Sequence, residues 1–195
     1  MKVKKMIPGN KFFWIVVLVA VDQGIKIFIA NFMIDLEFII IPTVFAFHPH
    51  QNINLGWIWN MLDFMMPLSI AVIISLIATI VIIIFYRYGS FHCNRIERGK
   101  MLPEIFFPFA MAGAICKLID DIFWGGSLDY IRLFNWFIFD LKDVYLTVVA
   151  LPNGTLILLA QEIHMRKLPK NERKVEQEKY KILPWLKKGL PMKPE

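Results

Sequence analysis

The chain has 195 residues, of which 57% are hydrophobic, and a mean hydropathy of +0.53, which is too apolar for an ordinary soluble domain. Because the apolar residues come in long blocks, the composition predicts an all-α membrane protein with about four transmembrane helices. The formal net charge of +6 does not indicate nucleic acid, since the Lys and Arg residues lie at the ends of apolar blocks, so membrane lipid is the expected partner.

Four apolar blocks are long enough to be predicted as membrane spans. They run from Phe12 to Phe32, Leu62 to Tyr86, Met101 to Ile119 and Asp143 to Ile163. The first block follows basic residues as a signal peptide does, but Asp22 and Gln23 stand where a cleavage site of small residues is needed, so we interpret it as an uncleaved span. The fourth contains Pro152, Asn153 and Gly154 and is predicted to be kinked or broken there.

The segments between the blocks differ in their content of basic residues. Lys and Arg gather before the first block, between the second and third, and after the fourth, whereas residues 33–61 have none and residues 120–142 have only Arg132 and Lys142. By the positive-inside rule, both termini and the middle segment are predicted to be cytoplasmic. The other two segments then lie outside, as a loop with a small β region after the first span and an amphipathic loop between the third and fourth.

The end of the chain differs from the rest in composition. Residues 1–163 form the predicted transmembrane domain, and residues 164–195 form a basic cytoplasmic tail with both charge signs and several prolines. The tail is predicted to be solvated and partly helical. The alternative is that it adsorbs to the membrane surface through Trp185 and its lysines.

Asp22 and Lys26 are ionisable residues inside the first predicted span. A charged side chain at membrane depth costs at least ~2.5 kcal/mol, so such residues usually pair with one another. Because they are four residues apart, the two side chains lie on one helix face and are predicted to form an ion pair. We interpret this pair as structural, tying the first helix to its neighbours.

Two further aspartates lie where predicted spans meet the outer surface. Asp120 closes the third span and Asp143 opens the fourth, and consecutive antiparallel helices place these ends close together. Two partly desolvated carboxylates at close range cannot easily both ionise, which is the arrangement an aspartyl hydrolase needs. The alternative is that both are interfacial helix-end residues, and Asp143 suits a helix N-terminus for electrostatic reasons alone.

Four stretches of the chain carry polar residues in a distinctive order. They are VDQGIKIF at 21–28, NLGWIWN at 54–60, AGAICKLIDDIFWGGSLDY at 112–130 and FDLKD at 139–143. In order and spacing they resemble the motifs DQxxK, NxGxxF, GAxGNxxDRxxxGxVxDF and FNxAD of the lipoprotein signal peptidase family, also called signal peptidase II. Members of that family are bacterial aspartyl peptidases with four spans.

The resemblance implies roles for particular residues. It makes Asp120 and Asp143 the catalytic aspartates, and it assigns support or substrate binding to Asp22, Lys26, Asn54, Gly56, Lys117, Asp121, Asp129 and Asp140. It implies a multi-pass aspartic endopeptidase of the bacterial cell membrane that removes signal peptides from prolipoproteins whose cysteine carries diacylglycerol. No cofactor is expected. No metal is expected either, since His48 and His50 have no third ligand nearby in the sequence.

The chain departs from the family pattern close to the expected chemistry. Lys117, Asp121, Asp140 and Lys142 stand where the family has Asn, Arg, Asn and Ala. In one interpretation, Lys117 and Asp121 pair across one helical turn and leave the aspartates working. In the other, Lys117 and Lys142 stabilise both catalytic carboxylates as anions and abolish acid catalysis. We favour a divergent, active peptidase over a non-catalytic relative that binds lipidated peptides or acts as a membrane accessory protein.

Overall fold

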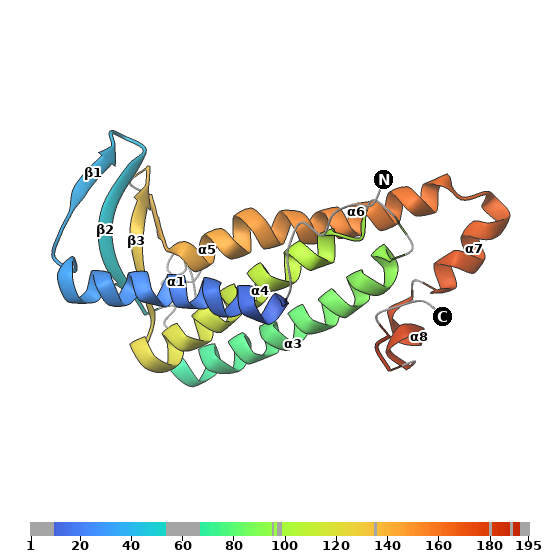
Figure 1. Cartoon of the computed structure of the whole chain (residues 1–195), viewed down its shortest axis with the longest axis horizontal. Coiled ribbons are helices and arrows are strands. Elements are labelled where there is room, and N and C mark those ends of the chain that lie inside the picture. Colours follow the sequence, from blue (N-terminus) through green and yellow to red (C-terminus); the bar gives the residue numbers. More distant parts are fainter. Residues whose placement is uncertain are drawn as a thin grey trace.

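Four long apolar helices form the body of the molecule. The computed structural model describes residues 10–53, 67–94, 96, 99–134, 136–179, 181–187 and 189–191. The helices that are long and apolar enough to cross a membrane are Lys11–Phe32, Leu68–Cys93, Leu102–Trp124 and Leu141–Lys167. The predicted number of spans is therefore confirmed. A small sheet lies at one end of the bundle and the C-terminal tail at the other (Figure 1).

The first two spans are single helices. Helix α1 (Lys11–Phe32) begins after Asn10, whose side chain accepts a hydrogen bond from the Phe12 backbone N–H at 3.1 Å. Helix α3 (Leu68–Cys93) follows Pro67 and exposes many isoleucines along its length. Such a surface is what lipid, rather than water, solvates favourably.

The other two spans contain stretches of π-helix. The third runs as α4 (Leu102–Ile119) and then η2 (Asp120–Trp124), and the fourth as α5 (Leu141–Val144), η3 (Tyr145–Ala150) and α6 (Leu151–Lys167). The expected break in the fourth span is absent, because 141–167 is one continuous helix. Pro152 is instead the second residue of α6, one residue after the wider turns of η3, which accommodate a residue that has no backbone N–H.

A four-stranded antiparallel sheet caps the end of the bundle where α1 finishes. Its strands are β1 (Phe38–Ile41), β2 (Phe45–Asn52), β3 (Ser127–Leu133) and β4 (Phe137–Phe139), in that spatial order. The β region predicted after the first span is confirmed. The segment expected as an amphipathic loop also contributes β3 and β4, because pairing with β2 satisfies its backbone hydrogen bonds.

The apolar core lies between α3, α4 and the fourth span. Tyr86, Phe106 and Ile157 are buried in it, and small residues let the helices approach closely. At Gly113 of α4, an added Cβ atom would lie 2.6 Å from Cγ of Leu146 on η3. The contact between the third and fourth spans therefore requires glycine at this position.

Gly113→Val is expected to destabilise the protein by about 1 to 3 kcal/mol, because the new side chain would force Leu146 and η3 outward. Thermal unfolding in detergent measures the effect. The matched control is Gly24→Val on α1, where an added Cβ atom meets nothing within 4 Å. Equal unfolding temperatures for the two variants would contradict this account of the helix contact.

The tail folds back onto the end of α3. It forms α7 (Lys170–Lys179) and α8 (Ile182–Lys187), so the prediction of a partly helical tail is confirmed. Trp185 is 2% exposed, its ring meets Tyr88 edge-on, and its indole N–H donates to the Pro191 carbonyl at 3.0 Å. Arg87 donates two hydrogen bonds to the Leu190 carbonyl. The alternative in which Trp185 adsorbs to the membrane is wrong, because the indole is buried within the protein.

Trp185→Ala is expected to release the tail from α3. Truncating a buried tryptophan costs about 3 kcal/mol or more, so trypsin should cleave the basic tail over tenfold faster. Trp136→Ala is the control, because Trp136 is 74% exposed and lies between β3 and β4, in the sheet at the other end of the bundle. A tail cleaved at the wild-type rate in the Trp185 variant would show that the docking is not stable.

Candidate functional site

Helix α1 contributes a buried ion pair near the end of the bundle where the sheet lies. Asp22 and Lys26 are fully buried, and the Lys26 Nζ atom lies 3.0 Å from Asp22 Oδ2. The pair predicted from the spacing of four residues is therefore present. Gln23, beside Asp22, donates from Nε2 to Asp120 Oδ1 at 3.0 Å and accepts from the Trp124 indole N–H at 3.1 Å.

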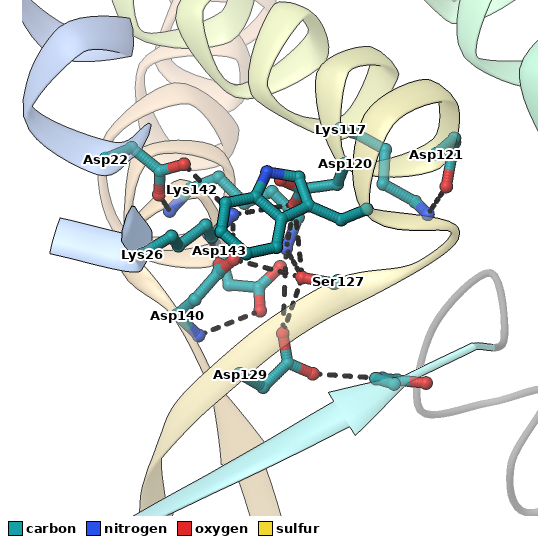
Figure 2. A network of polar contacts seen from close by, with 12 residues as sticks. Asp22, Lys26, Lys117, Asp120, Asp121, Ser127, Asp129, Asp140, Lys142 and Asp143 are labelled. Atoms are coloured by element: carbon teal, nitrogen blue, oxygen red, sulfur yellow. Dashed lines mark hydrogen bonds and ion pairs between the residues drawn. The ribbon is translucent and has the colours of Figure 1, made fainter. Parts of the chain in front are cut away.

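Lys26 is the centre of a larger network. Its Nζ atom lies 2.6 Å from Asp120 Oδ2 and 2.7 Å from Asp140 Oδ2, and both of these carboxylates are buried (Figure 2). Asp120 begins η2, and Asp140 immediately precedes α5. Lys26 therefore ties α1 to the ends of the third and fourth spans, as the interpretation of the Asp22–Lys26 pair requires.

Lys117 and Asp121 form a separate pair on the third span. The Lys117 ammonium bonds to Asp121 Oδ1, and the Ser75 hydroxyl of α3 donates to Asp121 Oδ2 at 3.0 Å. The helix-face pair predicted by the first interpretation is thus confirmed. Lys117 is directed to Asp121, which does not support the second interpretation for this lysine.

Strand β3 contributes two side chains to the network from one face. Ser127 and Asp129 are two residues apart, so both point toward the bundle. The Ser127 hydroxyl lies 2.7 Å from Asp129 Oδ1, 3.2 Å from Asp120 Oδ2 and 3.1 Å from Asp140 Oδ2. Asn52 of the neighbouring strand β2 donates to Asp129 Oδ2 at 3.0 Å. The sheet therefore fixes the position of the Asp129 carboxylate.

The start of the fourth span supplies three more residues. Asp140 caps α5, and its side chain and that of Asp143 exchange hydrogen bonds with each other's backbone N–H groups. The Lys142 backbone N–H donates to Asp22 Oδ1 at 3.0 Å. The Lys142 ammonium bonds to Ser127 and Asp140, and lies 3.3 Å from Asp120 Oδ2 and 3.7 Å from Asp129 Oδ1.

Asp143 faces Asp129 across this network. Single carboxylate oxygens of Asp129, Asp140 and Asp143 lie within 4.8 Å of one another. Asp140 is bound by both Lys26 and Lys142. Among the described residues, Asp143 makes no ion pair with a basic side chain, and it is partly exposed. Asp129 and Asp143 therefore form the pair of facing carboxylates with the least counter-charge.

The sequence predicts Asp120, rather than Asp129, as the partner of Asp143. The geometry favours Asp129, because Asp120 is fully buried and its Oδ2 atom lies 2.6 Å from the Lys26 ammonium. This short ion pair ties the Asp120 carboxylate to α1. In this structure Asp120 is the partner of Lys26, and its expected catalytic role stays a prediction.

The pKa values of Asp129 and Asp140 are shifted in opposite directions. Burial raises the pKa of Asp129 above its usual value, although Lys142 opposes the shift. Burial also acts to raise the pKa of Asp140, but the neighbouring Lys142 and Lys26 lower it below its usual value. Asp140 is therefore an anion, and Asp129 is the carboxyl in the sheet that is ready to hold a proton.

Two other kinds of site use residues of these types. A metal ion could be ligated by Asp129, Asp140 and Asp143, but two ammonium groups already supply the positive charge beside Asp140. A serine–lysine hydrolase would use Ser127 as nucleophile and Lys142 as base. That base must be a neutral amine, whereas Lys142 is in contact with carboxylates on three sides.

Sequence reasoning missed several members of the network. Asn52 and Ser127 contact Asp129 and were not predicted, and Gln23, which matches the DQxxK motif but was given no role, donates to Asp120. The signal that identifies Ser127 is its spacing of two residues from Asp129, which is the period of a strand. The predicted residues Asn54 and Gly56, with Trp57, Ile58 and Trp59 nearby, lie outside the described residues.

These observations define a class: a membrane protein of four spans with a buried acidic network where the spans meet a small sheet. A family model described as signal peptidase (SPase) II matches residues 14–161. The chain therefore belongs to the signal peptidase II family and is a multi-pass membrane peptidase of that family.

Two solved structures share the fold, and both are described as bacterial membrane enzymes determined by the in meso method. The first has a TM-score of 0.60 and 23% identity, and the match covers 84% of this chain and 93% of the other. The second has a TM-score of 0.55 and 21% identity, covering 82% and 96%. None of the curated proteins matches the chain significantly.

Proposed function

We propose that this protein is an aspartic endopeptidase that removes signal peptides from prolipoproteins carrying diacylglycerol on their cysteine. The observation that carries the proposal is the pair of facing carboxylates, Asp129 and Asp143, in a chain of the signal peptidase II family. Lys26, Asp120 and Asp140 hold the ends of three spans around this pair. The site is thereby fixed in place before a substrate binds.

The two carboxyl groups divide the acid and base roles. The ionised member takes a proton from water, and the resulting hydroxyl oxygen attacks the carbonyl carbon of the scissile bond. The protonated member donates its proton to the carbonyl oxygen, which gives a tetrahedral diol. One diol hydroxyl then returns its proton, the C–N bond breaks, and the leaving amine takes the proton that came from water. One water is consumed and the pair regains its starting state.

The site is proposed to lie at the outer surface of the membrane. The basic residues at the start of α1, at the end of α3 and in the tail gather at the end of the bundle opposite the sheet. The positive-inside rule then places that end and both termini in the cytoplasm. A cytoplasmic membrane protein with this orientation would meet secreted precursors after their export.

The surface beside the site is suited to a lipidated substrate. Ile122 and Phe123 of η2 follow Asp121 directly and expose 51% and 79% of their side chains, respectively. Strand β1 is also apolar and exposed along its whole length. Apolar surface of this kind binds acyl chains as it binds membrane lipid, so the lipid of the precursor can hold the scissile bond near Asp129 and Asp143.

Cleavage of a lipidated precursor tests the proposal. Purified protein in detergent should convert a diacylglyceryl prolipoprotein to its mature form, with mass spectrometry locating the cut before the modified cysteine. The same precursor with serine in place of that cysteine, and therefore without lipid, should remain uncut. Binding of the lipidated precursor without cleavage would support the non-catalytic alternative, and cleavage of both precursors would refute the lipid requirement.

A further inference from the structure

Lys142 occupies a position in the acidic network that the reaction itself does not explain. The side chain is 4% exposed, and its ammonium contacts Ser127 and Asp140 directly. It also lies 3.7 Å from Asp129 Oδ1, and Asp143 is the next residue along the chain. Lys142 is therefore the basic side chain nearest the Asp129 carboxylate among the described residues.

The network has fewer positive than negative groups. Five carboxylates face two ammonium groups: Asp22, Asp120, Asp129, Asp140 and Asp143 against Lys26 and Lys142. Lys117 and Asp121 neutralise each other and do not alter this difference. When every group is ionised, the negative charges exceed the positive ones. The number of protons that the network holds at a given pH therefore depends strongly on each ammonium.

The charged groups that act on the Lys142 ammonium come from several elements. They are Lys26 of α1, Asp120 of η2, Asp129 of β3, Asp140 before α5 and Asp143 of α5. Asp22 of α1, Cys116 of α4, Tyr130 of β3 and Tyr145 of η3 interact with other members of the same network. Lys26 is already shared among Asp22, Asp120 and Asp140. Lys142 is the cation that remains to act on Asp129.

We propose that Lys142 is a positioning residue for the Asp129–Asp143 pair, whose ammonium sets the pH at which the pair gives up its first proton. This inference rests on the proposed function. The ammonium stabilises the ionised form of nearby carboxyl groups, so the singly protonated pair is reached at a lower pH than the carboxylates alone would allow. Lys142 also holds Asp140 and Ser127 against the pair.

Removing the Lys142 ammonium should shift the pH dependence of cleavage in one direction. Without Lys142, the pKa of Asp129 rises further, because burial and the other carboxylates then act with less opposition. The doubly protonated pair, which has no base, persists to higher pH. The acidic limb of the pH–rate profile of Lys142→Met should therefore move upward by about 1 to 2 pH units.

Substituting Asp140 removes a charge of the opposite sign beside the same carboxyl pair. Asp140→Asn removes one negative charge but keeps a residue that caps α5 well, so the acidic limb should move downward. The double variant Asp140→Asn/Lys142→Met removes one charge of each sign. Its acidic limb should return close to the wild-type position. A role in packing alone does not predict shifts of opposite sign that cancel.

Two lysine variants serve as controls for this experiment. Lys142→Arg keeps the positive charge, so the position of the acidic limb should be retained. Lys117→Met removes a lysine near the end of the third span that pairs with Asp121 and is not part of the network, and its acidic limb should also stay in place. A shift in Lys117→Met as large as that in Lys142→Met would contradict the assignment to Lys142.

The outcomes separate this inference from the proposed function. Wild-type protein that cleaves no lipidated precursor at any pH would refute the function. Active wild type with superposable profiles for Lys142→Met and Asp140→Asn would refute the inference alone. If Lys142→Met does not fold, the Asp140→Asn variant and the double variant still test the inference. An acidic limb of Asp140→Asn that does not move downward would contradict the role of charge.

Discussion

Asp129→Asn and Asp143→Asn should each reduce cleavage of a lipidated precursor by about 10³-fold or more, because either change removes the proton-sharing partner of the other carboxyl group. Neither variant should lower thermal stability appreciably. Asparagine at 129 can accept from Asn52 through its amide oxygen and donate to the Ser127 hydroxyl oxygen through its amide nitrogen. Each change also removes one negative charge from a network that has an excess of them. Cleavage assays and thermal unfolding on the same preparations measure both effects.

Asp120→Asn provides the contrast that distinguishes the two candidate pairs. Its substitution weakens the ion pair with Lys26, so the defect should include a lower unfolding temperature. If Asp120→Asn abolished cleavage at full stability while Asp129→Asn remained active, Asp120 would be the partner of Asp143, as the sequence motif implies. The geometry of Asp129 would then be coincidental.

Lys26→Met should destabilise the protein by about 3 to 5 kcal/mol, because it leaves buried carboxylates without their ammonium partner. The expected result is a large fall in the unfolding temperature and in the amount of protein recovered from membranes. The double variant Lys26→Met/Asp120→Asn should recover part of the lost stability, since the second change removes one of the unpaired charges. Differential scanning fluorimetry in detergent measures these effects.

The matched control for this prediction is Lys11→Met at the other end of α1. Lys11 pairs with Glu104 at 2.8 Å, but both side chains are partly exposed. A pair of this kind contributes only about 0 to 1 kcal/mol. If the two lysine variants unfolded at the same temperature, the network around Lys26 would not hold the spans together.

The spans and the pairs within helices could be predicted because they depend on local patterns. Apolar blocks of sufficient length define α1, α3, α4 and the fourth span, whatever their contacts. A spacing of four residues places Asp22 beside Lys26, and Lys117 beside Asp121, on any regular helix. Their partners across the bundle were beyond such reasoning, since no local pattern specifies which helix ends meet.

The choice between Asp120 and Asp129 depended on a strand that the sequence did not reveal. Residues 127–133 lie in a segment predicted to be a loop, so the spacing of two residues between Ser127 and Asp129 did not predict a shared strand face. Once β3 pairs with β2, both side chains must face the bundle, and Asp129 comes within reach of Asp143. Asp120 enters η2 instead and is directed to Lys26.

The departures from the family motifs resolve into two local charge pairs. Lys117 bonds to Asp121, and Lys142 bonds to Asp140, so each added positive charge lies against an added negative charge. Each pair is neutral in itself, although Asp121 also replaces the positively charged Arg of the motif. The sequence offered this explanation for Lys117 alone, because the helical spacing of four residues has no counterpart between Asp140 and Lys142, which lie at the cap of α5.

The most direct test of the central claim is to detect the proton that Asp129 and Asp143 share. Infrared difference spectra of purified protein at neutral pH report the carbonyl band of a protonated carboxyl group. We predict such a band in the wild type and its disappearance in both Asp129→Asn and Asp143→Asn, while Asp121→Asn retains it because Asp121 is paired with Lys117. A wild type without the band, or a band that survives both substitutions, would contradict the shared proton.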